Sequence, residues 1–268
     1  MSETAPDRRS RRGGGRDARR QLRSNSAMVA MPYIVRQLEP FDILSDESAE
    51  IIENNAEIIL EEIGIDFRDD PEALTILRDV GCDVQGERVH FPRGLARQLC
   101  STAPASYTQH ARNPARTVEI GGKNTVFAPV YGPPFVRDLN NERRYATMED
   151  FRNFVKIVYM HPGLHHSGGT ICEPVDLPVT KRHLEMVYAH QRYSDKPYMG
   201  SVTAPSRAQD TVDMSKILFG DEFVANNTVI SSLINANSPM TWDDTMLGAL
   251  KVYARNNQAV SISPFILA

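Results

Sequence analysis

Tryptophan, cysteine and long apolar runs are all scarce in this chain of 268 residues. It has one tryptophan, and its three cysteines, Cys82, Cys100 and Cys172, are widely spaced and odd in number. This pattern does not suit the disulfide framework of a small secreted domain, and the N-terminus has no signal-peptide h-region. Every apolar run stops well short of the about 18 residues that predict a membrane span. We therefore expect a cytoplasmic protein without a membrane partner.

Familiar catalytic motifs are missing as well. The string HSGGT does not have the spacing of a Walker or Rossmann phosphate loop, and no Ser-His-Asp or Cys-His arrangement is evident. His161, His165 and His166 lie near Cys172, but a proline and a glycine interrupt the helix that metal ligands four residues apart would need. Adjacent side chains of a strand also face opposite ways. We expect no metal site, and a metal-dependent barrel hydrolase is the weakest function that we consider.

Basic residues are concentrated at the N-terminus. Residues 1–30 hold eight arginines and three acidic residues, whereas the rest of the chain has 22 basic and 31 acidic residues. The run RRSRRGGGRDARR lacks apolar periodicity, which is typical of a disordered, solvated tail. Such tails can bind nucleic acid, but no aromatic residue interleaves these arginines and the body is acidic. We therefore expect a disordered tail over residues 1–30 and no nucleic-acid partner.

The next two regions differ in pattern. Residues 31–104 read as a small helical region, with Ser45 and Asp70 as expected N-caps and Gly64 as a helix end. Residues 105–146 hold short strand-like runs separated by GGK, YGPP and NNE, which predicts an antiparallel β insertion. The predicted helices cover 45–63, 71–80 and 92–100, a hairpin covers 83–91, and the strand-like runs are 117–120, 125–128 and 134–139.

From residue 147 to residue 268 strands and helices alternate. Thr147 and Asp150 form the expected capping box of the first helix. The later repeats of about 30 residues predict parallel strands with right-handed crossovers. A closed (β/α)8 barrel needs eight such units and about 250 residues. We therefore predict an α/β fold, a TIM barrel truncated after about four strands at Ala268. The expected strands are 164–172, 197–202, 228–234 and 259–267, and the expected helices are 178–193, 206–219 and 241–256.

The stretch TVISSLINANSPMTWDD, residues 228–244, marks the expected rim of the active site. An apolar run ends in Asn235, Asn237 and Ser238, and a helix is expected to start near Trp242. Ligands of parallel α/β folds bind at the C-terminal ends of the strands. The amides and the hydroxyl are therefore candidate ligand-binding groups. The alternative is that they close a turn and cap the next helix.

A family resemblance rests on four strings that run from about residue 38 to the end. They are FDILSDESAEIIENNAEIILEEIGIDF, PVYGPPFVRDL, MEDFRNFVKIVYMHPGLHHSGGTICEPVDLP and NSPMTWDDTMLGALKVYARNNQAVSISPFILA. These strings resemble the N-terminal portion of the trimethylamine methyltransferase family. The resemblance implies a TIM barrel that passes a methyl group from trimethylamine, or a quaternary amine such as glycine betaine, to the Co(I) of a corrinoid protein.

The same resemblance sets the expected cofactor and partner. The corrinoid (cobalamin) would be carried by a cognate partner protein and not bound directly by this chain. Archaeal trimethylamine enzymes of the family carry a pyrrolysine in their later half, and members without it act on quaternary amines. That position lies beyond residue 268. A homo-oligomer, and an inactive fragment or interaction module of the same family, stay open as alternatives.

The implied substrate directs attention to aromatic side chains. Aromatic faces bind a cationic ammonium, each contributing about 0.5–2 kcal/mol. Trp242 beside the amides and Tyr131 in the YGPP turn are the candidate substrate-binding rings, and His166 is a candidate polar residue of the pocket. Packing in the core is the alternative for each ring, and we expect it for Tyr198 and Phe135. No catalytic residue is assigned, because a leaving amine without a proton to lose needs no general base.

Overall fold

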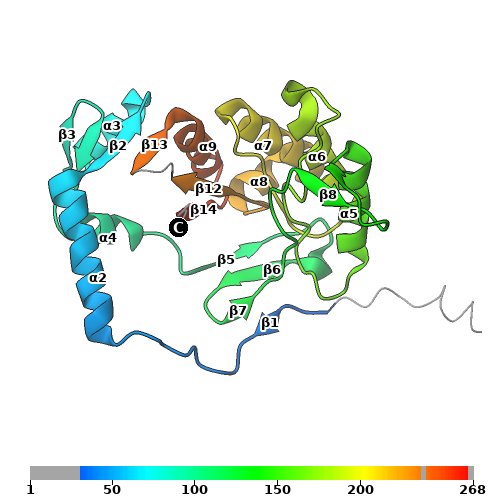
Figure 1. Cartoon of the computed structure of the whole chain (residues 1–268), viewed down its shortest axis with the longest axis horizontal. Helices are drawn as coiled ribbons and strands as arrows, with labels where there is room; N and C mark the ends of the chain where they lie inside the picture. Colours follow the sequence, from blue (N-terminus) through cyan, green and yellow to red (C-terminus); the bar gives the residue numbers. More distant parts are fainter. Residues whose placement is uncertain (1–30, 237–239, 265–268) are drawn as a thin grey trace, which may run out of the picture. The chain divides into compact units, whose positions relative to one another are not determined.

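The computed structural model describes residues 31–236 and 240–264. They fall within one compact unit that spans residues 31–268. The described residues form a mixed α/β structure of helices and small sheets of two or four strands, with no closed barrel among them (Figure 1). No helix within these residues is long and apolar enough to cross a membrane. The expected disordered tail lies outside the described residues.

The N-terminal helices begin and end where the local signals predict. Helix α2 (Asp46–Ile58) is capped by the hydroxyl of Ser45 and continues into a π-helical turn, η1 (Ile59–Ile63), that ends at Gly64. Asp70 caps α3 (Pro71–Asp79) in the same way. The predicted hairpin is formed by β3 (Asp83–Gln85) and β4 (Arg88–His90), and α4 (Leu95–Cys100) follows it. These helices and the hairpin confirm the sequence predictions, except that α4 begins three residues after the expected start at Pro92.

One sheet joins segments that are distant in the sequence. Its four strands have the order β13-β2-β4-β3, and β2 (Ile65–Arg68) pairs antiparallel with β4 but parallel with β13 (Thr241–Asp243). The expected helix over 241–256 therefore starts later, as α9 (Asp244–Arg255), with Asp243 as its N-cap. The helix expected to start near Trp242 thus begins two residues later, because the open edge of β2 takes residues 241–243 into a strand.

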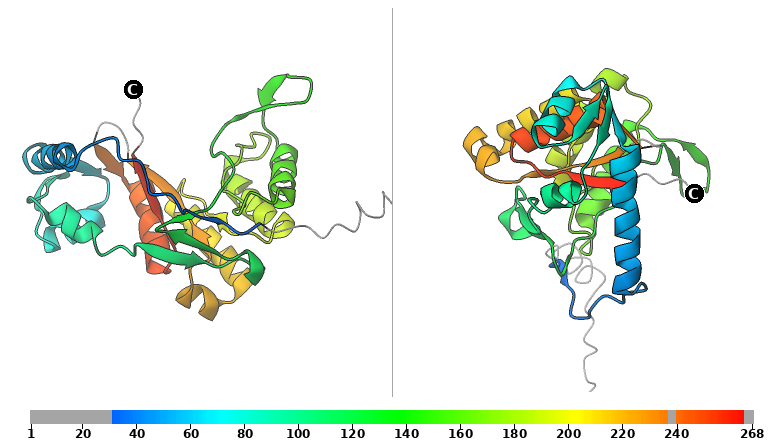
Figure 2. Two further views of the ribbon diagram at one scale, coloured as in Figure 1. Left: turned by 90° about the horizontal axis from the view of Figure 1, so that it is seen from below. Right: turned by 90° about the vertical axis from the view of Figure 1, so that its left-hand side faces the viewer.

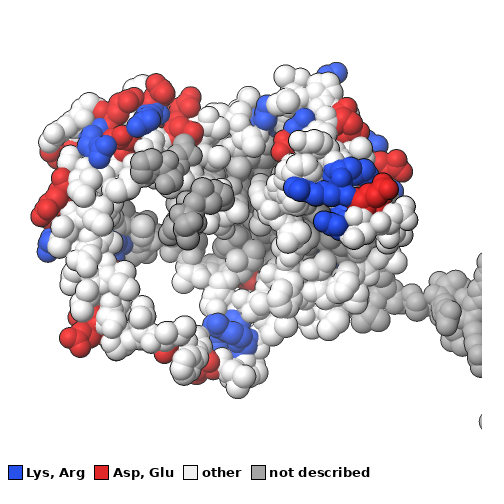
Figure 3. Space-filling model, viewed as in Figure 1, with Lys and Arg blue, Asp and Glu red and all other residues white. Residues whose placement is uncertain are grey.

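Antiparallel pairs fill the region between residues 105 and 146, as predicted. The first pair is β5–β6 and the second is the hairpin β8–β9, whereas β7 pairs with the short strand β1. The 3-10 turn η2 (Pro114–Arg116) precedes β6. On the face shown in Figure 3, basic side chains gather together with acidic ones over the β8–β9 hairpin. The strands are β1 (Ile34–Val35), β5 (Ser106–Gln109), β6 (Val118–Gly121), β7 (Asn124–Thr125), β8 (Phe135–Arg137) and β9 (Arg143–Tyr145).

Parallel pairing begins after helix α5 (Met148–Met160), whose capping box of Thr147 and Asp150 is confirmed. Strand β10 pairs parallel with β11, and β12 pairs parallel with β14. Helices lie between these strands along the chain, as the alternating pattern predicts. The bounds are α6 (Val179–Tyr193), β10 (Tyr198–Met199), α7 (Pro205–Phe219), α8 (Asp221–Asn226), β11 (Ile230–Ser231), β12 (Leu233–Ala236) and β14 (Ser261–Pro264).

The expected strand over 164–172 is wrong as a regular strand. Its central residues still reach the next strand, because Ser167 N–H donates to Pro197 O at 2.7 Å and Met199 N–H donates to Gly168 O at 2.9 Å. Gly168 has φ +86°, a left-handed conformation that breaks the extended backbone. This segment therefore runs beside β10 as an irregular chain and not as a ladder strand.

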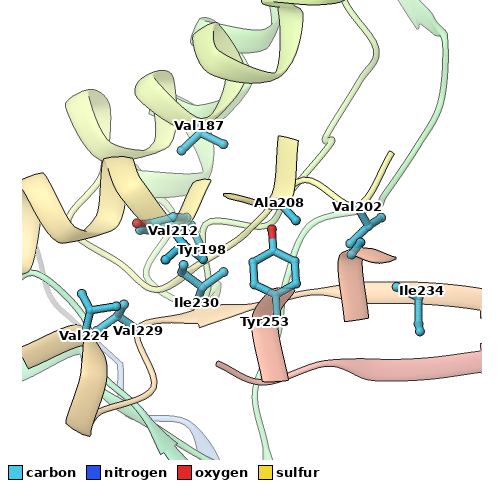
Figure 4. Packing of buried hydrophobic residues seen from close by; sticks show 11 residues of the cluster. Val187, Tyr198, Val202, Ala208, Val212, Val224, Val229, Ile230, Ile234 and Tyr253 are labelled. Carbon is cyan, nitrogen blue, oxygen red and sulfur yellow. The ribbon is translucent and has the colours of Figure 1, made fainter. Parts of the chain in front are cut away.

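The largest hydrophobic cluster lies between the parallel strands and the helices. Figure 4 shows Tyr198 and Ile230 of adjacent strands together with Val187 of α6, Val212 of α7 and Tyr253 of α9. Tyr198 is buried here, as expected. In both views of Figure 2, β12 and β14 lie side by side with α9 against the pair. Because the helices cover this face, the alternate residues of the strands face the other way and are available to a site.

Candidate functional site

The YGPP loop is held along the segment that follows residue 164. Gly132 N–H donates to Thr170 O at 2.7 Å, and Glu173 N–H donates to Pro133 O at 3.0 Å. Gly132 has φ +88°, which a residue with a side chain adopts only with strain. These two bonds hold Tyr131 beside the residues that lead from Gly169 toward α6. The loop therefore places an aromatic ring at the expected ligand-binding edge.

Tyr131 lies against a backbone that has no side chain at the point of contact. A Cβ atom added to Gly169 would lie 2.7 Å from Tyr131 Cε2 and 2.9 Å from Met199 Cβ. Burial raises the pKa of the Tyr131 hydroxyl, and a hydrogen bond with Thr170 partly offsets this effect. The missing side chain of Gly169 therefore leaves the space that the ring of Tyr131 occupies.

We expect Gly169→Ala to lower the free energy of unfolding by about 1–3 kcal/mol, because a new methyl group overpacks this contact. Urea denaturation measures the change. The double variant Gly169→Ala/Tyr131→Ala should recover part of the loss, since the ring that clashes is gone. Unaltered stability of the single variant would contradict the close contact between Tyr131 and Gly169.

A pocket of about 260 Å3 lies next to this ring. Its polar and apolar walls come from strand β12, the loops of the parallel region and the N-terminal halves of α6, α7 and α9. It brings together Tyr131 and Asn235, two of the residues predicted from the sequence. The lining residues are Tyr131, Gly132, Thr170, Glu173, Val179, Arg182, His183, Met186, Val202, Thr203, Arg207, Leu233, Asn235 and Met246.

Register explains why Asn235 reaches this pocket. Ile234 of β12 is fully buried in the hydrophobic cluster. Its neighbours Leu233 and Asn235 line the pocket instead, because successive side chains of a strand point to opposite faces. The parallel partner of Asn235 is Ser263 of β14. The strand end at which the apolar run stops therefore presents the Asn235 amide to the site.

Charged groups form one wall of the pocket. Arg182, in the first turn of α6, makes an ion pair with Glu173 through Nη1 and donates from Nη2 to Leu177 O at 3.2 Å. Arg207, in the first turn of α7, donates from Nη1 to Thr203 Oγ1 at 2.8 Å. The pocket thus contains one carboxylate and two guanidinium groups beside an aromatic ring and an amide.

A buried histidine lines the same wall. His183 Nε2 lies 2.7 Å from Asp210 Oδ2 of α7, and the imidazole is 5% exposed. Its Nδ1 is buried and has no partner in the structure. A buried polar atom of this kind needs a partner from a ligand or from water. His183 is therefore a candidate ligand-binding residue, with Asp210 holding its orientation.

His166 belongs to a different cavity, of about 380 Å3, which Ser231 and Met199 also line. Gly168 N–H donates to His166 Nδ1 at 2.9 Å, so Nε2 carries the proton. This Nε2 lies 3.2 Å from Gln109 Oε1 and 3.3 Å from Ser231 Oγ. Burial lowers the pKa of His166 to about 3. The ring is thus a neutral donor within a buried polar network.

His165 faces elsewhere, as expected for adjacent residues of an extended segment. Its Nδ1 accepts from Phe127 N–H at 3.0 Å, and its ring stacks on that of Phe127. Among the residues that the structure describes, no group of three or more His, Cys, Asp and Glu side chains is placed to hold a metal ion.

Trp242 is not brought to the pocket of Tyr131. It lies in β13 opposite Phe67 of β2 and packs, partly buried, against two hydrophobic clusters. Phe135 is half-buried, with the guanidinium of Arg143 at 3.9 Å from its ring centroid. Asn237 and Ser238 lie outside the described residues.

Sequence reasoning missed the polar residues in the first turns of the helices. Arg182, His183 and Arg207 each follow a strand-to-helix loop, and helix N-termini lie at the same edge of a parallel sheet as the strand ends. Applying that rule to the helices as well as to the strands would have selected them. Gln109, which donates to Tyr198 O at 3.0 Å, gives no comparable signal.

Comparisons with known proteins agree on one family. The sequence model of the trimethylamine methyltransferase (MTTB) family matches residues 12–268 of this chain. The chain is 43% identical over 232 residues to a glycine betaine methyltransferase of Desulfitobacterium hafniense (strain Y51), covering 86% of this chain and 48% of the relative. It is 25% identical over 228 residues to a proline betaine:corrinoid methyltransferase of Eubacterium limosum, covering 82% and 46%. The chain thus spans about half the length of these relatives.

Proposed function

Because the chain belongs to the trimethylamine methyltransferase family, we propose that it transfers a methyl group from a quaternary amine to the cobalt of a corrinoid carried by a partner protein. The similarity to a glycine betaine methyltransferase over most of the chain carries this proposal. A pocket with an aromatic ring, a carboxylate and an amide at the ends of parallel strands supports it. Membership in this family does not support the alternative function of a metal-dependent hydrolase.

We also propose that residues 147–268 contribute half of a TIM barrel, after a helical region (31–104) and an antiparallel insertion (105–146). Two parallel pairs, β10–β11 and β12–β14, support this arrangement. The irregular segment around Ser167 extends the series on one side by its hydrogen bonds to the residues of β10. Helices α5, α6, α7 and α9 pack in sequence against one another, as the outer layer of such a barrel would.

The size of the pocket fits the amine better than the corrinoid. At about 260 Å3 it is smaller than the pockets of roughly 300–1,000 Å3 that take drug-sized ligands, and a corrin macrocycle is too large for it. A small quaternary amine fits this volume. The corrinoid supplies the nucleophile for the methyl group when its carrier protein docks, and the residues of this chain hold the methyl donor.

Each lining residue has a role in that task. The ring of Tyr131 offers a face to the cationic ammonium, and the Glu173 carboxylate balances its charge. Asn235 offers an amide for hydrogen bonds. Val202 and Leu233 exclude water from the reacting methyl group, which strengthens the electrostatic contacts. Because the leaving amine carries no proton to lose, none of these residues has to act as a base.

We expect Tyr131→Ala to weaken binding of a quaternary amine about 5- to 30-fold, because one cation–π contact of about 1–2 kcal/mol is lost. Tyr131→Phe keeps the ring face and should bind nearly as well as the wild type. Tyr188→Ala, a change of an exposed tyrosine on α6, serves as the control. Isothermal titration calorimetry with glycine betaine measures affinity, and methylation of an added corrinoid protein, followed by absorbance, measures turnover.

The proposed function would be contradicted if the wild-type chain neither bound a quaternary amine nor methylated any corrinoid protein. Equal affinities of Tyr131→Ala and the wild type would show that the ring does not bind the substrate, but would not contradict the proposed reaction.

A further inference from the structure

The pocket contains more positive charge than a purely cationic ligand would favour. Two guanidinium groups, those of Arg182 and Arg207, line it beside the single carboxylate of Glu173. Glu173 already makes an ion pair with Arg182. Among the described residues, no Asp or Glu makes an ion pair with Arg207, whose guanidinium donates to the hydroxyl of Thr203. The charge of Arg207 is therefore available to a ligand.

Two nitrogen atoms of the same wall are buried without partners. Arg182 donates through Nη1 and Nη2, but its Nε is buried and makes no hydrogen bond in the structure. His183 Nδ1 also lacks a partner, and this side chain is more than nine-tenths buried. Because Nε2 of the ring bonds to the Asp210 carboxylate, Nδ1 is an acceptor in a neutral imidazole. Unsatisfied buried donors are rare because each costs about 1–3 kcal/mol. A ligand with an acceptor oxygen would satisfy Arg182 Nε.

We propose that Arg207 and Arg182 bind the carboxylate of the substrate and thereby select zwitterionic quaternary amines over purely cationic ones. This inference rests on the proposed function, since it assigns the substrate class of the same pocket. Arg207 takes the carboxylate end together with the free Nε of Arg182, and Tyr131 takes the ammonium end. Arg207 is the specificity-determining residue, because its charge has no ion-pair partner among the described residues.

Charge and desolvation explain the expected selectivity. A planar guanidinium group pairs with a carboxylate through two parallel hydrogen bonds. A ligand without a carboxylate leaves Arg207 unpaired and places two positive charges in one small pocket. Such like charges repel each other more strongly near protein than in bulk water, because the effective dielectric constant is lower. A carboxylate on the ligand thus attracts Arg207 and also offsets the repulsion between Arg207 and the ammonium group.

The test compares two probes that differ in the carboxylate. Glycine betaine carries it, and tetramethylammonium does not. By isothermal titration calorimetry of the full chain, Arg207→Met should weaken glycine betaine binding about 10- to 100-fold, the loss of a charge-assisted hydrogen bond. Tetramethylammonium should bind Arg207→Met as well as, or better than, the wild type. Arg192→Met is the matched control, since Arg192 is exposed on α6 away from this pocket. Its affinities for glycine betaine and for tetramethylammonium should equal those of the wild type.

The outcomes separate this inference from the proposed function. If Arg207→Met weakened both probes equally, or neither, the carboxylate role of Arg207 would be overturned while binding of quaternary amines stood. If the wild type bound neither probe, the proposed function itself would fail. Arg207→Lys, which keeps the charge but not the planar pair of donors, should lie between the wild type and Arg207→Met. Circular dichroism checks that each variant is folded.

Discussion

Lys196→Met is expected to lower the free energy of unfolding by about 3 kcal/mol. Lys196 is 3% exposed, and its ammonium donates to three carbonyl oxygens, those of Val158 at 2.7 Å, His161 at 3.0 Å and Leu164 at 2.7 Å. These carbonyls lie at the end of α5 and in the loop after it, where helical hydrogen bonds run out. Val158 O and His161 O also accept long backbone bonds of 3.3 Å, from His161 N–H and Leu164 N–H. The methionine would remove all three ammonium hydrogen bonds in a buried site.

Opposing effects set the size of this loss. Each unsatisfied buried carbonyl costs about 1–3 kcal/mol. Burial, together with the nearby charge of Arg116, lowers the pKa of Lys196 to about 8, which shows that keeping the ammonium charged costs free energy. Removing the charge recovers that cost, so the net loss is smaller than the sum over three hydrogen bonds.

Urea denaturation at pH 7 measures the effect, and Lys181→Met provides the control. Lys181 is exposed in the first turn of α6, and surface substitutions of this kind change stability by less than about 0.5 kcal/mol. A loss at Lys196 no larger than that at Lys181 would show that the ammonium does not satisfy these carbonyls.

Acidification between pH 6.5 and pH 4 is expected to destabilise the protein through two buried histidines. Burial lowers the pKa of His166 to about 3, and burial, with the nearby Gly169 carbonyl opposing, lowers that of His190 to about 4, from 6.5 for a free imidazole. Below pH 6.5 the unfolded chain binds a proton at each histidine and the folded chain does not. The free energy of unfolding therefore decreases as the pH is lowered, by up to about 1.4 kcal/mol per pH unit for each histidine.

The contacts of His190 explain why it stays neutral. One ring nitrogen, Nδ1, lies 2.7 Å from Ser167 Oγ, and Nε2 donates to Gly169 O at 2.8 Å. The ring also packs against Phe151. A charged imidazolium would lose its hydration without gaining a carboxylate partner among these contacts. Through its bonds to Ser167 and Gly169, His190 holds the segment that leads to the candidate site.

Denaturation curves at pH 7, 6 and 5 measure the slope. His190→Gln should lower stability at pH 7 but reduce the slope, because one of the groups whose pKa is lowered by folding is gone. His161→Gln is the control, since His161 is exposed. The Asp150 carboxylate responds at lower pH, because Arg144 holds its pKa well below the usual range. A slope that His190→Gln leaves unchanged would contradict the linkage.

Local signals in the sequence were sufficient for the helix boundaries. Ser45, Asp70 and Thr147 accept hydrogen bonds from the first turns of their helices, as their residue types predicted. A cap depends on residues within a few positions of one another, so the surrounding fold hardly changes it. The alternation of β12 also placed Asn235 on the open face, because side-chain direction in a strand follows from order alone.

Long-range contacts decided the features that the sequence could not show. Trp242 became part of a strand because the edge of β2, far away in the sequence, was free to pair with it. The first expected barrel strand lost its regular form at Gly168, where a turn competes with extended backbone. Tertiary pairing overrides local propensity in such segments, because each hydrogen bond to a distant strand outweighs a small intrinsic preference.

The candidate site shows the same division. Tyr131 and Asn235 were predicted from their places beside a turn and at a strand end, and they line one pocket. Arg182, His183 and Arg207 join them only because parallel pairing brings successive helix N-termini to one edge. The sequence by itself therefore determined the family, the caps and the polar strand end. The tertiary structure alone decided which charges meet in the pocket, because that depends on the packing of segments remote in the chain.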